Sequence, residues 1–249
     1  MALYEDCLRT GQWLFERRGW LPLFGVAALL GLILSAAPPS HPETVPQAWP
    51  LACFLVSCVG LGIRAYTVGC AAPGTSGRNR GAQVAKTVNT TGMYSVVRHP
   101  LYLGNFIAWL GPILLLRRPW PGMVFALVFW LYYERIMFAE EEFLRKEYGP
   151  TFEEWSARTP AFLPDFRRWV PPAVPFKWRV VLRREYSGLA QLVTIFAVLD
   201  LAEWRISSGR WWISPFWAWA LVLGLLVAGI LRLLRKRTSL LQDRPATPS

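Results

Sequence analysis

Residues 211–234, WWISPFWAWALVLGLLVAGILRLL, decide the fold class because they form an apolar run long enough to cross a lipid bilayer. A membrane-spanning helix needs about 20 mostly apolar residues. Further apolar segments near this length lie at 20–37, 49–68, 102–116, 120–138 and 187–201. The sequence therefore predicts an all-α fold, a polytopic transmembrane helix bundle of about six spans.

Composition and charge favour a lipid bilayer as the partner of this chain. Hydrophobic residues make up 53% of it and charged residues 17%, whereas soluble domains carry about 25% charged residues. The net charge of +11 would also suit nucleic acid. The basic residues, however, lie between the apolar runs, where they suit an anionic cytoplasmic leaflet. We therefore expect a membrane protein that binds no nucleic acid.

The distribution of basic residues predicts the orientation of the spans. Cytoplasmic loops carry an excess of Lys and Arg. If both termini are cytoplasmic, the outer loops hold only four basic residues, Arg117, Arg118, Arg205 and Arg210. We therefore expect cytoplasmic N and C termini. The segment 20–37 could alternatively be a cleavable signal peptide; its length and the acidic residues before it favour a membrane anchor.

The cysteines indicate neither a metal site nor a disulfide. Their spacing matches no zinc site and no disulfide framework, and two of them lie inside an apolar run; they are Cys7, Cys53, Cys58 and Cys70. The sequence says nothing about the oligomeric state.

The first cluster of candidate functional residues lies in GMYSVVRHPLYLG, residues 92–104. Pro100 suits the first turn of a helix, where its missing N–H costs nothing. Arg98 and His99 then stand just before a helix N-terminus, whose free amides can bind a ligand carboxylate. The plainer interpretation is that Arg98 extends to the membrane surface and His99 caps the helix.

The second cluster, Glu140-Glu141-Glu142, directly follows the apolar run 120–138. Acidic groups at membrane level are costly and tend to face a cavity or a partner, although a run of three can simply be solvated. A helical hairpin returns its ends to one side, so we expect His99 near Glu140. Because a helix turns about 100° per residue, we expect Glu142 to be the glutamate that faces solvent.

The combined pattern resembles a known enzyme family. Gly-x-Tyr-x-x-x-Arg-His-Pro-x-Tyr-x-Gly, a helical hairpin, a Glu-Glu pair and Leu-x-x-x-Tyr-Gly follow one another over residues 86–164. This order is similar to that of the isoprenylcysteine carboxyl methyltransferases and of the related phospholipid N-methyltransferases and small-thiol methyltransferases. The resemblance implies methyl transfer from S-adenosylmethionine to a lipid-like or small membrane-accessible acceptor.

The resemblance also implies a cofactor pocket on the cytoplasmic face. Its expected cofactor-binding residues are Thr87, Val88, Tyr94, His99, Pro100, Leu101, Tyr102 and Glu140. The candidate catalytic residues are Arg98, His99 and Glu141, with His99 either a general base or, as we favour, a cofactor contact. The expected domains are N-terminal helices and an inner loop (1–85), the methyltransferase core (86–170), and an interfacial segment with a C-terminal transmembrane pair (171–249).

Two departures from the family and two alternatives stay open. Ile136 stands where family members that act on prenylated cysteine have an Arg, with Arg135 beside it, and Lys86 stands where a His precedes the cofactor strap. An NADPH-dependent membrane reductase of the steroid-reductase type shares the Arg-His-Pro turn but differs at Leu101 and Asn105. A non-catalytic membrane protein that retains the fold is the second alternative.

Overall fold

A computed structural model describes residues 2–19, 24, 25, 27, 28, 31, 48–72 and 87–238. The expected first span, 20–37, falls almost entirely outside these residues. The main elements are α1 (Ala2–Arg17), α3 (Ala48–Cys70), α4 (Met93–Val96), α5 (Pro100–Leu114), α6 (Pro119–Tyr148), α7 (Pro150–Arg158), the short 3-10 helix η2 (Phe166–Arg168), α8 (Trp178–Ser208) and α9 (Pro215–Arg237). The described part contains no strand, which confirms the all-α fold.

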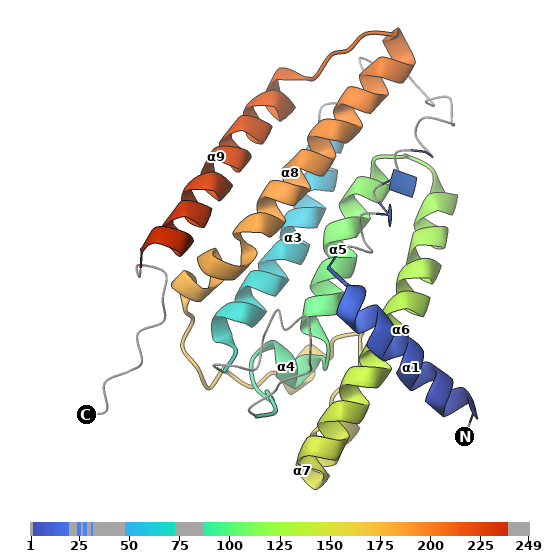
Figure 1. The fold of residues 1–249 in the computed structure, drawn as a ribbon, viewed down its shortest axis with the longest axis vertical. Coiled ribbons are helices and arrows are strands. Elements are labelled where there is room, and N and C mark those ends of the chain that lie inside the picture. Colours follow the sequence, from blue (N-terminus) through green and yellow to red (C-terminus); the bar gives the residue numbers. More distant parts are fainter. Residues whose placement is uncertain are drawn as a thin grey trace.

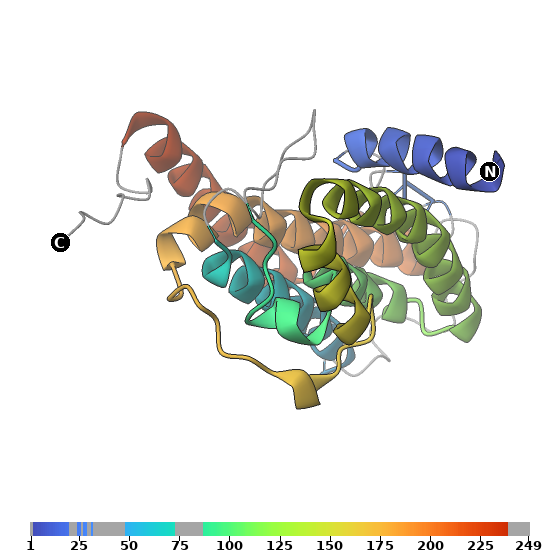
Figure 2. The same ribbon diagram turned by 90° about the horizontal axis from the view of Figure 1, so that it is seen from below.

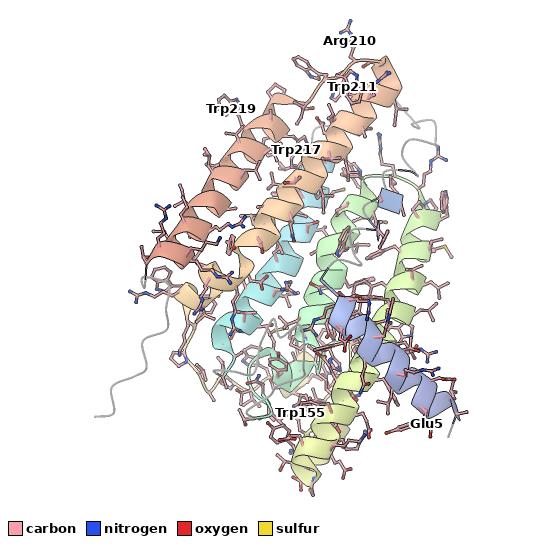
Figure 3. The ribbon with its side chains drawn as sticks, in the orientation of Figure 1. Glu5, Trp155, Arg210, Trp211, Trp217 and Trp219 are labelled. Carbon is pink, nitrogen blue, oxygen red and sulfur yellow. The ribbon has the colours of Figure 1, made fainter. Side chains whose placement is uncertain are left out.

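Five long helices, α3, α5, α6, α8 and α9, lie side by side as a bundle (Figure 1). Figure 2 looks onto the end of the bundle that carries α4, α7 and the segment 159–177. We call this the α4–α7 end, and the opposite end, where α8 turns into α9, the hairpin end. Figure 3 shows Trp155 at the α4–α7 end and Arg210 and Trp211 at the hairpin end.

Three described helices, α3, α6 and α9, are long and apolar enough to cross a membrane, and α5 is apolar but shorter. The expected spans 49–68 and 120–138 lie within α3 and α6, and most of 102–116 and 211–234 lies in α5 and α9. The segment 187–201 is part of the longer α8, which carries more charge. The all-α helix bundle is confirmed, with three helices that could cross a membrane, whereas the count of six spans stays a prediction.

Helices α3 and α5 pack so closely that their backbones nearly touch. A side chain at Gly60 would collide with the backbone of Ala108 and with the carbonyl oxygen of Gly104. One turn earlier, the Ser57 hydroxyl donates to the Ala108 carbonyl at 2.7 Å. Small residues allow this approach between helices in a membrane, where packing replaces the hydrophobic effect as the driving force. This seam places the start of α5 beside the C-terminal third of α3.

Helices α8 and α9 form an antiparallel pair that packs on α3 through aromatic rings. Gly209 ends α8 in the left-handed conformation with φ 71°, a common way to close a helix. The Phe196 and Trp217 rings stack at 5.1 Å, and Phe54 of α3 meets both edge-on. The pair is thus attached to the bundle by large side chains, whereas small ones join α3 to α5.

The helix that contains the expected span 120–138 extends well beyond it, because α6 continues without a break to Tyr148. Two short helices, α7 and η2, follow. The segment beyond them returns across the α4–α7 end, where the Val170 carbonyl accepts from Gly92 N–H at 2.9 Å and Ser95 Oγ accepts from Val170 N–H at 2.9 Å. The expected domain border at 170 therefore lies inside a hydrogen-bonded segment.

The N-terminal helix α1 was not foreseen from the sequence. It lies across the second half of α6 (Figures 1 and 2). Gly11 is buried there, and a side chain at this position would collide with the Arg135 carbonyl oxygen and the Ala139 methyl group. Phe15 joins a core cluster with Tyr102 and Tyr133. The start of the chain is therefore packed against the helix that carries the three glutamates.

Candidate functional site

The Arg-His-Pro turn is held by backbone contacts on both sides. His99 precedes α5 and its carbonyl accepts from the N–H groups of Tyr102 and Leu103, both at 3.1 Å. The Arg98 N–H donates to the Pro160 carbonyl at 2.8 Å, and the His99 N–H to that of Ala161 at 3.2 Å. These two amides are therefore occupied by the segment after α7. A ligand carboxylate would have to use other donors.

The expected meeting of this turn with the glutamates of α6 is present. Glu141 accepts from Arg98 Nη1 at 2.7 Å and from His99 Nε2 at 2.8 Å. The other ring nitrogen of His99, Nδ1, lies 3.6 Å from Glu140 Oε2. A buried imidazole thus bridges two adjacent carboxylates, and the partly buried guanidinium of Arg98 completes the cluster. We call these four residues the carboxylate cluster.

The carboxylates control the proton affinity of His99. Burial lowers its pKa, but hydrogen bonds and charge from Glu140 and Glu141 outweigh burial, so the pKa lies above the usual histidine value. A histidine with a raised pKa releases its proton less readily. This environment favours a protonated ring that holds the two carboxylates in place.

Arg98 contributes a donor that no described residue uses. Its Nη1 binds Glu141, but its Nε is buried and has no hydrogen-bond partner in the part of the chain that the structure describes. Most buried polar groups in proteins are paired, and an exception calls for a ligand, an ion or a functional role. The cluster therefore offers both a carboxylate pair for a cation and a spare guanidinium N–H for an anion. This donor set fits a ligand that carries ammonium, sulfonium and carboxylate groups.

Aromatic residues surround the cluster. The Tyr102 ring is stacked on His99 with centroids 5.6 Å apart, and its other neighbour, Tyr133, lies at 4.6 Å. Burial raises the pKa of Tyr94; the charge of Glu140 raises it further and that of Arg64 opposes the rise. The Tyr94 side chain is therefore within electrostatic range of both charges. Its own carbonyl accepts from Trp155 Nε1 at 3.0 Å.

The remaining expected cofactor residues differ in their burial and in their relation to the carboxylate cluster. Pro100 is fully buried as the first residue of α5, and Leu101 is half-buried. Thr87 is exposed and Val88 is half-buried. No contact recorded among the described residues joins Thr87 or Val88 to the carboxylate cluster, so their role as a strap stays a prediction.

The expectation for Glu142 is wrong. Its exposed fraction is 8%, the lowest of the three glutamates. It accepts from Arg145 Nη1 at 2.8 Å and lies 3.5 Å from Lys146 Nζ. The sequence argument placed it on the solvent side of α6, but that side is covered by the unforeseen helix α1.

Sequence reasoning missed two arginines that border the site. Arg18, just after α1, lies 3.4 Å from Glu140. Arg64 of α3 binds Glu185 of α8 through two bonds of 3.0 and 2.9 Å and donates to Asn105 at 2.7 Å. A charge inside an apolar run marks a functional candidate, and this signal could have identified Arg64. Arg18 carries no comparable local signal.

A polar chain links Arg64 to the helix of the glutamates. Asn105 accepts from Arg64 and its Nδ2 donates to the Tyr133 hydroxyl at 3.0 Å. Glu185 therefore connects through α3 and α5 to α6. The C-terminal pair α8–α9 is joined to the surroundings of the site by this chain.

Comparisons with known proteins identify the segment that carries the cluster. Residues 56–151 match the model of the phospholipid methyltransferase family. The chain is 37% identical over 75 residues to the nickel-cobalt-cadmium resistance protein NccN of Alcaligenes xylosoxydans xylosoxydans, covering 30% of this chain and 35% of that protein. It is 35% identical over 75 residues to the protein-S-isoprenylcysteine O-methyltransferase of Schizosaccharomyces pombe, covering 30% and 32%.

A third relative is the protein-S-isoprenylcysteine O-methyltransferase B of Arabidopsis thaliana, 36% identical over 76 residues, covering 30% of this chain and 38% of that protein. The chain thus spans about a third of the length of these curated relatives. No solved structure matches it. These matches confirm the resemblance to isoprenylcysteine and phospholipid methyltransferases over the central segment.

Proposed function

We propose that this protein transfers a methyl group from S-adenosylmethionine to a membrane-accessible acceptor. The observation that carries the proposal is the carboxylate cluster, in which the buried Arg98 Nε has no hydrogen-bond partner among the residues that the structure describes. It lies within the segment that matches the phospholipid methyltransferase model. The cluster offers the opposite charges that a ligand with ammonium, sulfonium and carboxylate groups needs. It lies on the helices that carry the resemblance to the methyltransferases.

Each residue of the cluster has a role that follows from its contacts. Glu140, whose contacts to His99 and Arg18 are long, would balance the positive charge of the cofactor. Arg98 Nε would bind its carboxylate. When bound, S-adenosylmethionine supplies an electrophilic methyl group. Glu141 keeps Arg98 and His99 in place through bonds of 2.7 and 2.8 Å.

Positioning and exclusion of water are what the protein adds to this chemistry. Aligning the acceptor with the methyl group lowers the barrier, and removing water from the acceptor assists displacement. The rings of Tyr102 and Tyr133, with the fully buried Ile136, form an apolar wall beside the cluster. Because the pKa of His99 is raised, we assign His99 to binding, with no role as a general base.

Binding measurements test this proposal against its alternatives. Purified protein in detergent is titrated with S-adenosylmethionine and, separately, with NADPH. Binding of S-adenosylmethionine alone supports a methyltransferase, binding of NADPH alone supports a reductase, and binding of neither supports a non-catalytic protein.

A labelling experiment would determine the class of the methyl acceptor. Radiolabelled methyl donor is supplied with membranes that contain an S-alkylated cysteine derivative, phosphatidylethanolamine or an alkyl thiol. A methyl ester formed on a carboxylate is released by mild base, whereas a methyl group on nitrogen or sulfur is retained. The acceptor that is labelled identifies the class, and the base treatment confirms which atom received the methyl group.

We also propose that the α4–α7 end faces the cytoplasm, with both chain termini on that side. The support is the charge distribution, including Arg235, Lys236 and Arg237 at the end of α9, because cytoplasmic segments carry an excess of Lys and Arg. A reporter fused after Ser249 should behave as cytoplasmic, and one inserted near Thr44 as external. The reverse pattern would place the carboxylate cluster on the outer face.

A further inference from the structure

The N-terminal helix α1 brings a residue into the site from outside the matched segment 56–151. Close packing fixes its position on α6, because Gly11 leaves no room for a side chain against the Arg135 carbonyl and Ala139. The Tyr4 ring meets Phe138 edge-on at 5.5 Å nearer the start of the helix. The residue that follows α1 is therefore held close to Glu140.

That residue is Arg18, and its guanidinium lies between an aromatic ring and the carboxylate cluster. The guanidinium carbon lies 3.6 Å from the centre of the Phe15 ring, and Phe15 is buried with Tyr102 and Tyr133. Its Nη1 is 3.4 Å from Glu140 Oε1. Packing thus positions a permanent cation beside the carboxylate that the proposed function assigns to the cofactor's positive charge.

The contact between Arg18 and Glu140 differs from the neighbouring ion pair. Charge-assisted hydrogen bonds usually measure about 2.7–2.9 Å. The bond of Arg98 to Glu141, at 2.7 Å, lies in this range. Among the described residues, the ion-pair contacts of Glu140 are longer, 3.4 Å to Arg18 and 3.6 Å to His99, and Tyr102 donates a further hydrogen bond to this carboxylate. A quarter of its side chain is exposed, against 17% for Glu141. Glu140 is therefore the carboxylate whose partner can be exchanged.

We propose that Arg18 is the resident counter-ion of Glu140 and that a cationic group of the ligand replaces it on binding. The inference rests on the proposed function. A ligand that binds only after displacing a resident cation binds less tightly than it would to a free carboxylate. Arg18 thereby sets the affinity of the site for its cationic ligand, and α1 becomes part of that site.

Calorimetry with S-adenosylmethionine on four folded proteins tests this at a fixed pH, since His99 also faces Glu140. Partly exposed ion pairs are worth about 0.2–1 kcal/mol, so Arg18→Gln should bind roughly 1.4- to fivefold more tightly than the wild type. Arg18→Lys keeps the charge and should stay near the wild type. The control is Arg17→Gln, because Arg17 contacts Glu16 and Trp13 and not the cluster; its affinity should be unchanged.

The outcomes separate this inference from the proposed function. Weaker binding by Arg18→Gln would mean that Arg18 contacts the ligand directly, which overturns the proposed exchange. Unchanged binding would overturn the exchange as well, because Arg18 would then have no effect on the affinity. Failure of the wild type to bind S-adenosylmethionine overturns the proposed function and this inference with it. If Arg18→Gln does not fold, hydrogen exchange of residues 2–17 in the wild type decides: ligand should speed exchange in α1, and slower or equal exchange contradicts the proposal.

Discussion

The two ends of the bundle each hold a pair of acidic residues, but their hydrogen bonding differs. At the hairpin end, Asp200 accepts from the backbone N–H and the hydroxyl of Ser214 at 2.7 and 2.8 Å, and Glu203 pairs with Arg117 at 2.5 Å. At the α4–α7 end, the ion-pair contacts of Glu140 among the described residues are longer, 3.4 Å to Arg18 and 3.6 Å to His99. There, a buried donor of Arg98 also lacks a partner among the described residues.

The difference indicates how to separate a structural charge from a functional one. An acidic side chain whose hydrogen bonds are short, as at the hairpin end, stabilises a joint between helices. A cluster that keeps a spare buried donor and a loosely held carboxylate retains an unsatisfied polar group, which is costly in a protein interior. Proximity of charges alone does not make this distinction. The completeness of their bonding does.

The largest expected effect is loss of stability on removing Glu141. Glu141→Ala leaves the buried His99 and the partly buried Arg98 without their shortest side-chain partner. Breaking a buried ion pair on one side costs about 3–5 kcal/mol. Unfolding in mixed micelles measures the free energy, with the exposed Glu147→Ala as the matched control. A loss below about 1 kcal/mol would mean that the cluster does not hold the turn together.

The second effect concerns ligand affinity. Glu140→Gln preserves shape and removes the charge that should balance the cofactor. Hydrogen bonds to charged groups contribute about 1.5–3 kcal/mol, which is roughly ten- to hundredfold in affinity. We expect at least roughly tenfold weaker S-adenosylmethionine binding by calorimetry, and no change for Glu147→Gln. Because Glu142 is buried, it is not a suitable control. Equal affinities in the two variants would mean that Glu140 stabilises the fold and does not bind the cofactor.

The hairpin end should respond in stability alone. Asp200→Asn weakens the bonds to Ser214, and a typical hydrogen bond is worth about 1 kcal/mol. We expect a loss of that order in the mixed-micelle unfolding experiment and an unchanged affinity for S-adenosylmethionine. A marked fall in affinity would show that the two ends are coupled, contrary to the distinction drawn above.

The smallest expected effect is a pH dependence of the unfolding free energy that arises from His99 at the α4–α7 end. The pKa of His99 is raised in the folded protein. Its stabilising contribution is therefore fully present below the ordinary histidine pKa of about 6.5 and is lost as the pH rises through the higher folded value. The unfolding free energy of the wild type should fall over this window relative to His99→Gln. Parallel curves would mean that His99 is not protonated in the cluster.

The sequence predicted the site better than its surroundings. The hairpin argument correctly brought His99 to the glutamates, because a tight turn between two apolar runs leaves one possible arrangement. It was wrong for Glu142, because helical periodicity cannot show which face a distant segment covers. Arg18 was missed for the same reason: α1 combines apolar and charged residues, and its packing depends on Gly11 meeting α6. Local patterns predict helices, whereas contacts between distant segments require the folded chain.

The bridging position of His99 also gives the protein a built-in spectroscopic reporter. The chain contains two histidines, His41 and His99. Isotopic labelling of histidine alone would therefore yield two sets of ring signals, one of them from the centre of the carboxylate cluster. Ring nitrogens that face carboxylates at 2.8 and 3.6 Å give nitrogen and proton resonances distinct from those of a solvated imidazole. Any ligand that approaches Glu140 can thus be observed by magnetic resonance without altering a residue.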